Sequence, residues 1–207
     1  MILPKIYPIT DAGLTTLSHT EQIKRLILGG AEFIQLREKN APADSFYNDA
    51  LSALNQAGLS NVKLIINDRV DIALAAGAAG VHLGQNDLPP AEARKILGDD
   101  AIIGYSTHDH KQAREAVKLP VDYIAIGPVF ETSTKSNPDP TVGLEMITRI
   151  RETVKDFPLV AIGGITLENC RAVIDAGADS LAVIGGLLLP AEKITETYKK
   201  FVLEVNH

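Results

Sequence analysis

The chain alternates short apolar runs, rich in valine and isoleucine, with longer segments of mixed polarity. These runs lack the polar alternation of half-exposed strands, so they fit strands that are buried on both faces, as in a parallel sheet. We therefore predict eight strands, at Ile6–Thr10, Glu32–Arg37, Lys63–Asn67, Gly80–Leu83, Ile102–Ser106, Asp122–Gly127, Leu159–Gly163 and Ser180–Ile184.

Helices are predicted between these strands, and several have recognisable starts. Ser18 followed by Glu21 is a capping-box pattern, and Pro90 puts a proline in the first turn of the fourth helix. The seventh helix is predicted to start at Thr166, which can act as an N-cap, and the eighth to follow Pro190.

A weak internal repeat supports this order of elements. Glycine precedes alanine at Gly30, Gly77 and Gly177, where a helix is expected to end and a strand to begin within a few residues. Eight strand–helix units of about 25 residues use the whole chain, which predicts an α/β fold, a compact single-domain (β/α)8 TIM barrel over residues 1–207. A doubly wound open sheet is the alternative, but residues 10–13 lack its glycine-rich first turn.

Composition narrows the range of functions. The 207 residues have a formal net charge of −6, and a net-acidic chain without a basic run is not expected to bind nucleic acid. The apolar stretches fall short of the roughly 20 residues of a membrane helix. The single cysteine excludes an internal disulfide framework and a cysteine-rich zinc site. Residues 1–5 lack signal-peptide features, so we expect a cytoplasmic protein with small-molecule partners; a homodimer is one arrangement left open.

In a barrel of this kind, chemistry occurs at the carboxyl ends of the strands. The second strand ends with Gln35, Arg37 and Lys39 on one face, which favours an anion site; a solvated loop with an Arg–Glu pair is the alternative. Asp68 and Asp87 follow the third and fourth strands, which are neighbours. Two carboxylates beside cationic side chains predict a Mg²⁺ ion shared with a diphosphate, unless each aspartate only caps a helix.

The fourth and fifth strands add three further polar side chains. Ser106 has inward parity and is expected to hydrogen-bond a leaving-group oxygen. His108 is a general base or, alternatively, part of the start of the fifth helix. His82 also has inward parity, but we expect a core histidine there and assign it no catalytic role.

The last part of the chain predicts a second anion site. The polar segment after the sixth strand is long for such a loop, which favours a lid with Thr132, Thr134 and Lys135 as phosphate-binding groups, or a plain surface loop. Glycine pairs at 163–164 and 185–186 end strands seven and eight, where barrels bind phosphate through backbone N–H groups; tight turns are the alternative. The two sites together predict transfer between a diphosphate-bearing and a monophosphate-bearing substrate, with diphosphate leaving.

The strand-end motifs, taken in order, resemble those of the thiamine phosphate synthase (thiamine-phosphate pyrophosphorylase) family. The resemblance runs nearly end to end and lies in Gln35-Leu36-Arg37-Glu38-Lys39, Ile66-Asn67-Asp68-Arg69-Val70-Asp71, Val81-His82-Leu83-Gly84-Gln85 with Asp87, Ser106-Thr107-His108, Gly127-Pro128-Val129-Phe130 with Thr132-Ser133-Thr134-Lys135, and Ile162-Gly163-Gly164-Ile165.

The resemblance implies a transferase of thiamine biosynthesis that joins hydroxymethylpyrimidine diphosphate to a thiazole phosphate or its carboxylated form. It implies Mg²⁺ as the cofactor, held by Asp68 and Asp87. The implied catalytic residues are Arg37, Lys39, Ser106 and Lys135. The implied pyrimidine-diphosphate residues are Gln35, Leu36, Arg37, Glu38, Lys39, Asn67, Ser106 and Lys135. The implied thiazole-phosphate residues are Thr132, Ser133, Thr134, Gly164, Ile184 and Gly185.

Two positions depart from the family pattern. Gly185 stands where the family usually has serine, which removes one side-chain donor, and Glu131 replaces a commoner proline. The related thiazole tautomerases share a Phe-Glu-Thr segment but generally lack counterparts of Asp68 and Asp87. A non-catalytic phosphate sensor on the same barrel is a further alternative, although a sensor has no need of carboxylates that activate a leaving group.

Overall fold

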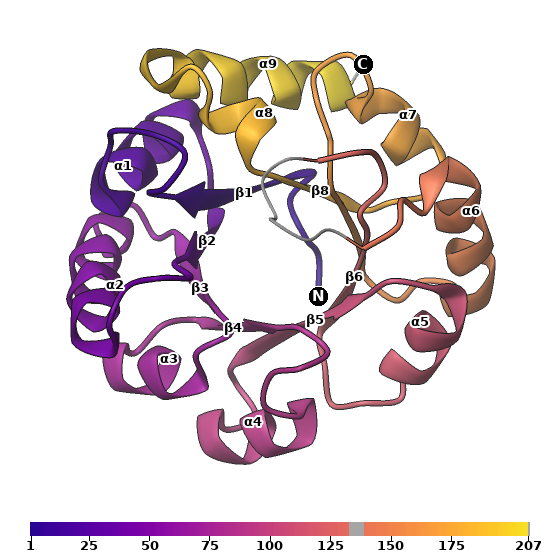
Figure 1. The fold of residues 1–207 in the computed structure, drawn as a ribbon, viewed down its shortest axis with the longest axis horizontal. Coiled ribbons are helices and arrows are strands. Elements are labelled where there is room, and N and C mark those ends of the chain that lie inside the picture. Colours follow the sequence, from indigo (N-terminus) through magenta and orange to yellow (C-terminus); the bar gives the residue numbers. More distant parts are fainter. Residues whose placement is uncertain (133–138, 207) are drawn as a thin grey trace.

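The computed structural model describes residues 1–132 and 139–206, and eight parallel strands within them close into a barrel (Figure 1). The strands are β1 (Ile6–Asp11), β2 (Phe33–Arg37), β3 (Lys63–Asn67), β4 (Gly80–Leu83), β5 (Ile102–Thr107), β6 (Tyr123–Ile126), β7 (Leu159–Ile162) and β8 (Ser180–Val183). Strand β8 pairs with β1 through Leu181 and Ile6, so the sheet has no open edge. The predicted (β/α)8 barrel is confirmed, and the open sheet is excluded.

The helices form a ring outside the strands (Figure 1). They are α1 (His19–Gly29), α2 (Ala43–Gly58), α3 (Val70–Ala76), α4 (Pro90–Leu97), α5 (His110–Ala116), α6 (Gly143–Val154), α7 (Cys170–Asp175), α8 (Gly185–Leu188) and α9 (Ile194–Asn206), with a 3-10 turn at Ala191–Lys193. The side chain of Ser18 accepts the N–H of Glu21 at 3.2 Å, and Pro90 is the first residue of α4. Both predicted helix starts are therefore confirmed.

One predicted helix start is wrong and one helix was missed. Helix α7 begins at Cys170, not at Thr166, because the side chain of Asn169 accepts the N–H of Thr166 at 2.8 Å and holds this segment as a turn. A helical segment does follow Pro190, as predicted, but the short helix α8 precedes it and was not predicted. Two glycines open α8, and glycine is a poor helix former, so propensity gave no signal for it.

Side chains alternate across each strand and form two apolar layers. Leu36, Ile66 and Val81 point outward and pack against the helices in one large core. A second cluster fills the barrel interior and includes Tyr7 and Tyr123. Each fully buried aliphatic side chain contributes about 1.5–3 kcal/mol, so these layers make the barrel a rigid support for the strand ends.

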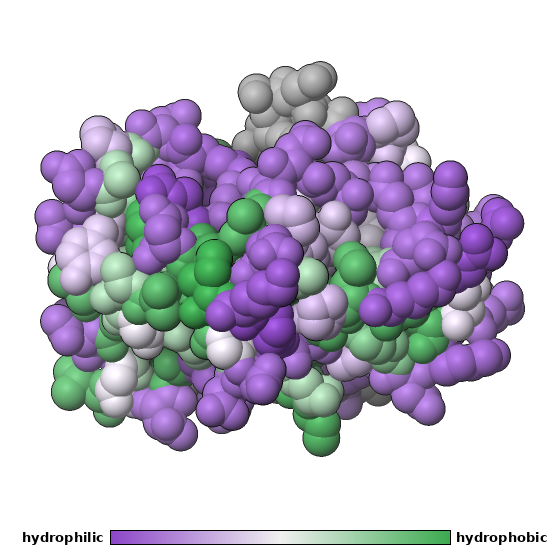
Figure 2. Space-filling model, turned by 90° about the horizontal axis from the view of Figure 1, so that it is seen from below, coloured by the Kyte–Doolittle hydropathy of each residue, from purple (hydrophilic) through white to green (hydrophobic). Residues whose placement is uncertain are grey.

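Seen from the side, the molecule presents a largely hydrophilic surface with hydrophobic residues between the polar ones (Figure 2). In the described part of the chain, no helix has the length and apolar character needed to cross a membrane. Polar side chains also gather around the strand ends, where a cavity opens.

Candidate active site

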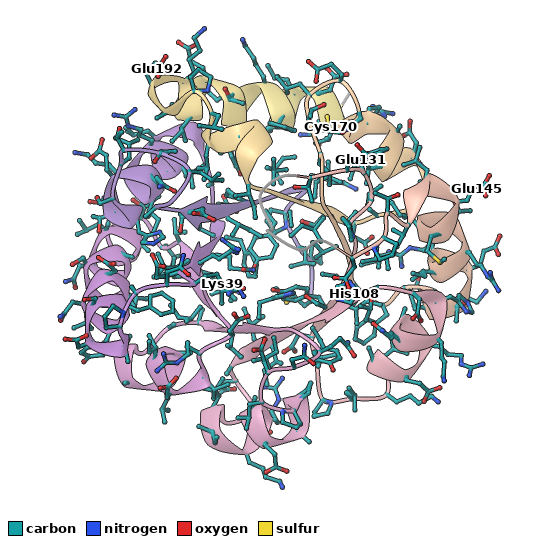
Figure 3. The ribbon with its side chains drawn as sticks, viewed as in Figure 1. Lys39, His108, Glu131, Glu145, Cys170 and Glu192 are labelled. Carbon is teal, nitrogen blue, oxygen red and sulfur yellow. The ribbon has the colours of Figure 1, made fainter. Side chains whose placement is uncertain are left out.

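A cavity of about 830 Å³ opens at the carboxyl ends of the strands, a volume typical of small-molecule sites. Of the predicted substrate and metal residues, those that line it are Gln35, Arg37, Lys39, Asn67, Asp68, Asp87, Ser106, Thr132, Gly164, Ile184 and Gly185. Lys39 and His108 lie on either side of the barrel centre, whereas Glu145 and Glu192 are on the outside of the ring (Figure 3). We call the expectation that functional residues lie at the carboxyl ends of the strands the strand-end rule. Here it correctly brings residues from distant parts of the sequence into one cavity.

The cationic side of the cavity is formed by Arg37 and Lys39. Arg37 makes an ion pair with Asp11 at the end of β1, and Lys39 pairs with Asp68 at the end of β3. The Arg37 and Asp11 side chains are only 16% and 14% exposed, so each half-buried charge needs its partner. Sequence reasoning missed Asp11, although the same strand-end rule, applied to β1, points to it.

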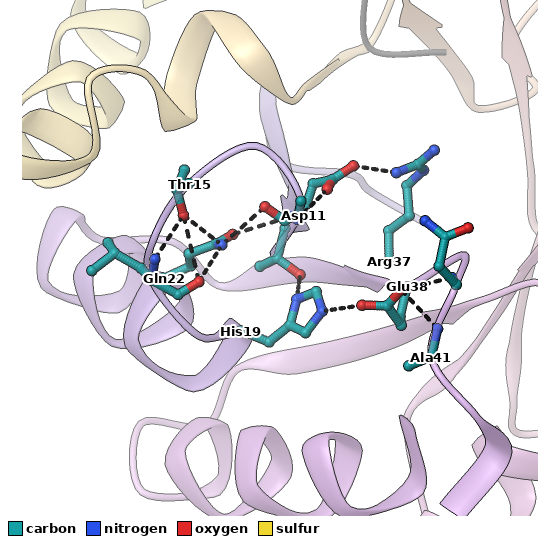
Figure 4. Close-up of polar contacts among 11 residues, drawn as sticks. Asp11, Thr15, His19, Gln22, Arg37, Glu38 and Ala41 are labelled. Carbon is teal, nitrogen blue, oxygen red and sulfur yellow. Dashed lines mark hydrogen bonds and ion pairs between the residues drawn. The ribbon is translucent and has the colours of Figure 1, made fainter. Parts of the chain in front are cut away.

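A second set of contacts fixes the segment that carries Lys39 (Figure 4). His19 bridges Thr10, at 2.9 Å, and Glu38, at 3.3 Å. The other oxygen of Glu38 accepts the N–H groups of Asn40 and Ala41, at 2.8 and 3.2 Å. Burial opposes ionisation of Glu38, but these hydrogen bonds outweigh it and lower its pKa. Glu38 therefore acts on the loop backbone.

Two residues of the predicted pyrimidine-diphosphate set do not line the cavity. Leu36 is fully buried in the outer core, and Glu38 is engaged by His19 and the loop backbone. The physical reason is parity, because side chains alternate along β2, so Gln35 and Arg37 face inward whereas Leu36 faces the helices. The assignment of Leu36 and Glu38 to the pyrimidine diphosphate therefore stays a prediction, and the cavity is reached at this strand by Gln35, Arg37 and Lys39.

The two aspartates after β3 and β4 lie together, as the sequence predicts. Asp87 accepts the N–H of Gly84 at 2.6 Å, and burial, followed by the neighbouring charge of Asp68, raises its pKa. Asp68 has φ 62°, a left-handed conformation that few residues other than glycine adopt readily. Neither aspartate is a helix cap, since the cap positions of α3 and α4 are Arg69 and Pro89.

The donor set around these aspartates fits a hard divalent cation that is only partly coordinated by protein. Across residues 1–132 and 139–206, no group of three or more His, Cys, Asp or Glu residues gathers as a metal centre. Mg²⁺ takes one or two carboxylates and completes its shell with water and phosphate oxygens, so the pair Asp68 and Asp87 is sufficient. Next to them, the buried amide nitrogen of Asn67 has no partner in the described structure, as expected of a donor that awaits an acceptor.

Ser106 and His82 meet at the floor of the cavity. The hydroxyl of Ser106 lies 2.9 Å from Nε2 of His82, and Nδ1 of His82 lies 3.0 Å from the hydroxyl of Tyr123. Burial lowers the pKa of His82 to about 4, against the attraction of Asp68, so the ring is neutral near pH 7. His82 is thus a satisfied, buried histidine, in agreement with the sequence analysis.

His108 lies just before α5, whose N-cap is Asp109. Its Nδ1 lies 2.7 Å from the carbonyl oxygen of Gly127, and its backbone N–H donates to Gln112. These contacts favour the structural alternative for His108 over the role of general base.

The opposite wall of the cavity is formed by the glycine-rich ends of β7 and β8. Gly164 has φ 64°, and a Cβ there would lie 2.4 Å from the carbonyl oxygen of Glu131, so only glycine fits. Gly185 is the first residue of α8, directly after β8. Loops after strands seven and eight, together with a short extra helix, form the common phosphate site of this fold. The exposed side chain of Glu131 lies at the rim of this wall.

The loop after β6 is only partly described. Thr132 lines the cavity, whereas Ser133, Thr134 and Lys135 lie outside the described residues. The roles assigned to these three residues therefore stay predictions.

Fold and site together define a (β/α)8 barrel whose cavity has a cationic, carboxylate-bearing wall opposite a glycine-rich wall. A family model described as thiamine monophosphate synthase matches residues 6–187. The chain is 47% identical over 202 residues to a thiamine-phosphate synthase of Koribacter versatilis, covering 94% of each chain. It is 46% identical over 185 residues to that of Clostridium novyi, covering 89% of this chain and 90% of the relative.

A solved structure agrees with these relatives. The thiamine phosphate pyrophosphorylase from Pyrococcus furiosus superposes with a TM-score of 0.87 at 36% identity, covering 98% of this chain and 95% of that one. The chain belongs to the thiamine monophosphate synthase family, and the protein is an enzyme of the transferase class.

Proposed function

We propose that the protein joins 4-amino-2-methyl-5-hydroxymethylpyrimidine diphosphate to a thiazole phosphate, or its carboxylated form, and releases thiamine phosphate and diphosphate. With the carboxylated form, carbon dioxide is released as well. The observation that carries the proposal is a single cavity with a cationic, carboxylate-bearing wall on β2 to β5 and a glycine-rich wall on β7 and β8. Two anionic groups can bind there at once. The barrel acts as one domain over residues 1–207.

The diphosphate binds on the first wall. Arg37 and Lys39 are already present as cations, held by Asp11 and Asp68, and phosphate oxygens supply further acceptors for their N–H groups. The unpartnered Nδ2 of Asn67 gains an acceptor in the same step. Binding of the diphosphate therefore satisfies a donor that the free protein leaves buried and unpaired.

Asp68 and Asp87 would hold Mg²⁺, and a bound metal ion would neutralise charge on the departing diphosphate. The two carboxylates repel each other in the free protein, and this repulsion contributes to the raised pKa of Asp87. A bound divalent cation would offset that repulsion.

The reaction is a substitution in which the leaving group departs first. The bond between the pyrimidine methylene carbon and the diphosphate oxygen breaks, and its electron pair leaves with the diphosphate. The lone pair of the thiazole nitrogen then forms the new carbon–nitrogen bond. Arg37, Lys39 and, by prediction, Lys135 stabilise the developing negative charge, and the step requires no side-chain base.

The thiazole phosphate binds on the second wall, near Thr132, Gly164, Ile184 and Gly185, with Ser133 and Thr134 as further predicted contacts. Gly185 offers only its backbone N–H, so this chain relies on main-chain donors where a serine would add a hydroxyl. We expect the site to bind the monophosphate with few side-chain donors.

The test is to mix the protein with both substrates, with Mg²⁺ or with EDTA, and to measure diphosphate and thiamine phosphate together. The proposal predicts both products with metal and neither with EDTA. Binding of thiazole phosphate without either product would contradict it and favour a tautomerase or a sensor. The same products in EDTA would refute the metal role alone.

A further inference from the structure

A chain of hydrogen bonds crosses the barrel interior and ends at two residues of the cavity. Gln35 Nε2 donates to the Tyr7 hydroxyl at 2.9 Å, and the Tyr7 and Tyr123 hydroxyls lie 3.0 Å apart. The Tyr123 hydroxyl lies 3.0 Å from His82 Nδ1, and His82 Nε2 lies 2.9 Å from Ser106 Oγ. The chain therefore links the end of β2 to the end of β5 through side chains of β1, β6 and β4.

The packing around this chain leaves its central members little freedom. Tyr7 and Tyr123 are at most 1% exposed, and the His82 ring stacks on that of Tyr123 with centroids 5.5 Å apart. A Cβ at position 104 would lie 2.0 Å from Cζ of Tyr123 and 2.5 Å from Nδ1 of His82. Gly104 thus leaves the space in which the hydrogen bond between these two side chains forms.

Counting the hydrogen atoms shows which group donates at each step of this chain of hydrogen bonds. Tyr7 accepts from the Gln35 amide, so its single hydrogen is donated to Tyr123. Tyr123 then donates its own hydrogen to Nδ1 of His82, which must be unprotonated. A doubly protonated ring would leave the hydrogen of Tyr123 buried without an acceptor.

The same count shows which hydrogen-bonding groups Ser106 and Gln35 present to the cavity. Neutral His82 carries its hydrogen on Nε2 and donates it to Ser106, whose own hydrogen is left for a group in the cavity. At the other end, Gln35 has given one Nε2 hydrogen to Tyr7, so its carbonyl oxygen and its second Nε2 hydrogen are left for the cavity.

We propose that Tyr7, Tyr123 and His82 are positioning residues that hold Gln35 as a hydrogen-bond acceptor and Ser106 as a hydrogen-bond donor toward the substrate. The inference rests on the proposed function for the identity of that substrate. It adds that the carbonyl oxygen of Gln35 is free to accept from the substrate, as from an exocyclic amine. It also adds that the group on Ser106 must accept, as a diphosphate oxygen does.

The opposite direction would reverse both ends. If Gln35 accepted from Tyr7, every hydrogen in the chain would shift, His82 would carry its hydrogen on Nδ1, and Ser106 would donate to Nε2. Ser106 would then offer only a lone pair to the cavity, next to a diphosphate that also offers only lone pairs. The tautomer of His82 therefore reports the direction of the whole chain.

The first experiment reads this tautomer without any substrate. Protein labelled with ¹⁵N-histidine is studied near pH 7.5 by long-range ¹H–¹⁵N correlation NMR, and the His82 signals are assigned by their loss in His82→Gln. A hydrogen on Nε2 supports the proposal, and a hydrogen on Nδ1 overturns it. This result does not depend on the reaction, so it stands or falls separately from the proposed function.

Two variants that each remove one hydroxyl sharpen the test. Tyr7→Phe leaves Tyr123 able to donate to His82, so the Nε2–H tautomer should persist. Tyr123→Phe removes the donor to Nδ1, so the preference for this tautomer should be lost. An unchanged tautomer in Tyr123→Phe would refute the role of Tyr123.

Kinetics distinguish positioning from stability. Tyr123→Phe should lower kcat/KM for the pyrimidine diphosphate by about tenfold or more, with the KM for thiazole phosphate unchanged. Tyr198→Phe is the matched control, because Tyr198 is a buried tyrosine on α9, outside the chain of hydrogen bonds. An equal loss in both variants, or a loss for both substrates, would mean a structural role only.

Discussion

Replacement of His82 provides a quantitative test of how burial changes the pKa of this residue, which is part of the chain of hydrogen bonds. Burial lowers the pKa of His82 to about 4, from an ordinary value of 6.5. The unfolded chain therefore binds a proton on this residue below pH 6.5, whereas the folded protein takes it up only near pH 4. Because the unfolded state binds more protons in this window, the folded state loses stability as the pH falls.

The magnitude follows from the difference between the two pKa values. Each unit corresponds to about 1.4 kcal/mol, so His82 should remove about 3 kcal/mol of stability between pH 6.5 and pH 4. The variant His82→Gln has no titrating ring at this position. Its free energy of unfolding should therefore fall less than that of the wild type over the same range.

The assay is urea unfolding of both proteins at intervals between pH 7.5 and pH 4.5. The difference in free energy of unfolding between wild type and His82→Gln should be constant above pH 7. It should then shift by about 2–3 kcal/mol against the wild type by pH 4.5. Parallel profiles would refute the reasoning, and Tyr198→Phe, which keeps His82, should follow the wild-type profile.

Four further substitutions test the metal site, the barrel packing and the phosphate site. Asp68→Asn and Asp87→Asn should each lower Mg²⁺-dependent turnover by about 100-fold, with unchanged circular dichroism and unchanged thiazole-phosphate binding; wild-type rates in both would exclude the metal role. Gly104→Ala should reduce the free energy of unfolding by about 1–3 kcal/mol in urea, because its Cβ overlaps Tyr123; an unaffected midpoint would contradict that packing. Gly185→Ser should lower the KM for thiazole phosphate a few-fold by adding a hydroxyl donor, and an unchanged or higher KM would argue against phosphate at this turn.

Much of the fold could be predicted from the sequence because buried parallel strands have a simple pattern. Continuous apolar runs located all eight strands to within a residue or so at each end, and the count of eight gave the barrel. The strand-end rule then brought Arg37, Lys39, Asp68 and Asp87 into one cavity. These predictions worked because both the parity of a strand and the polarity of a barrel are local rules.

The remaining features depend on contacts between distant segments. Helix α8 is opened by two glycines, so its formation reflects its place after β8 and not its propensity. Thr166 does not cap α7, because the side chain of Asn169 holds the Thr166 N–H in a turn first. Parity alone would place Tyr7 and Tyr123 inside the barrel, but no sequence rule joins their hydroxyls across 116 positions.

The most direct measurement is the stoichiometry of the proposed reaction. Diphosphate and thiamine phosphate should be quantified in the same samples over time, with wild type and Asp87→Asn, in Mg²⁺ and in EDTA. The account predicts that the two products appear in equal amounts, with wild type and Mg²⁺, and that both are lost together when the metal or Asp87 is removed. Diphosphate without an equal amount of thiamine phosphate, or no product from the wild type with metal, would contradict it.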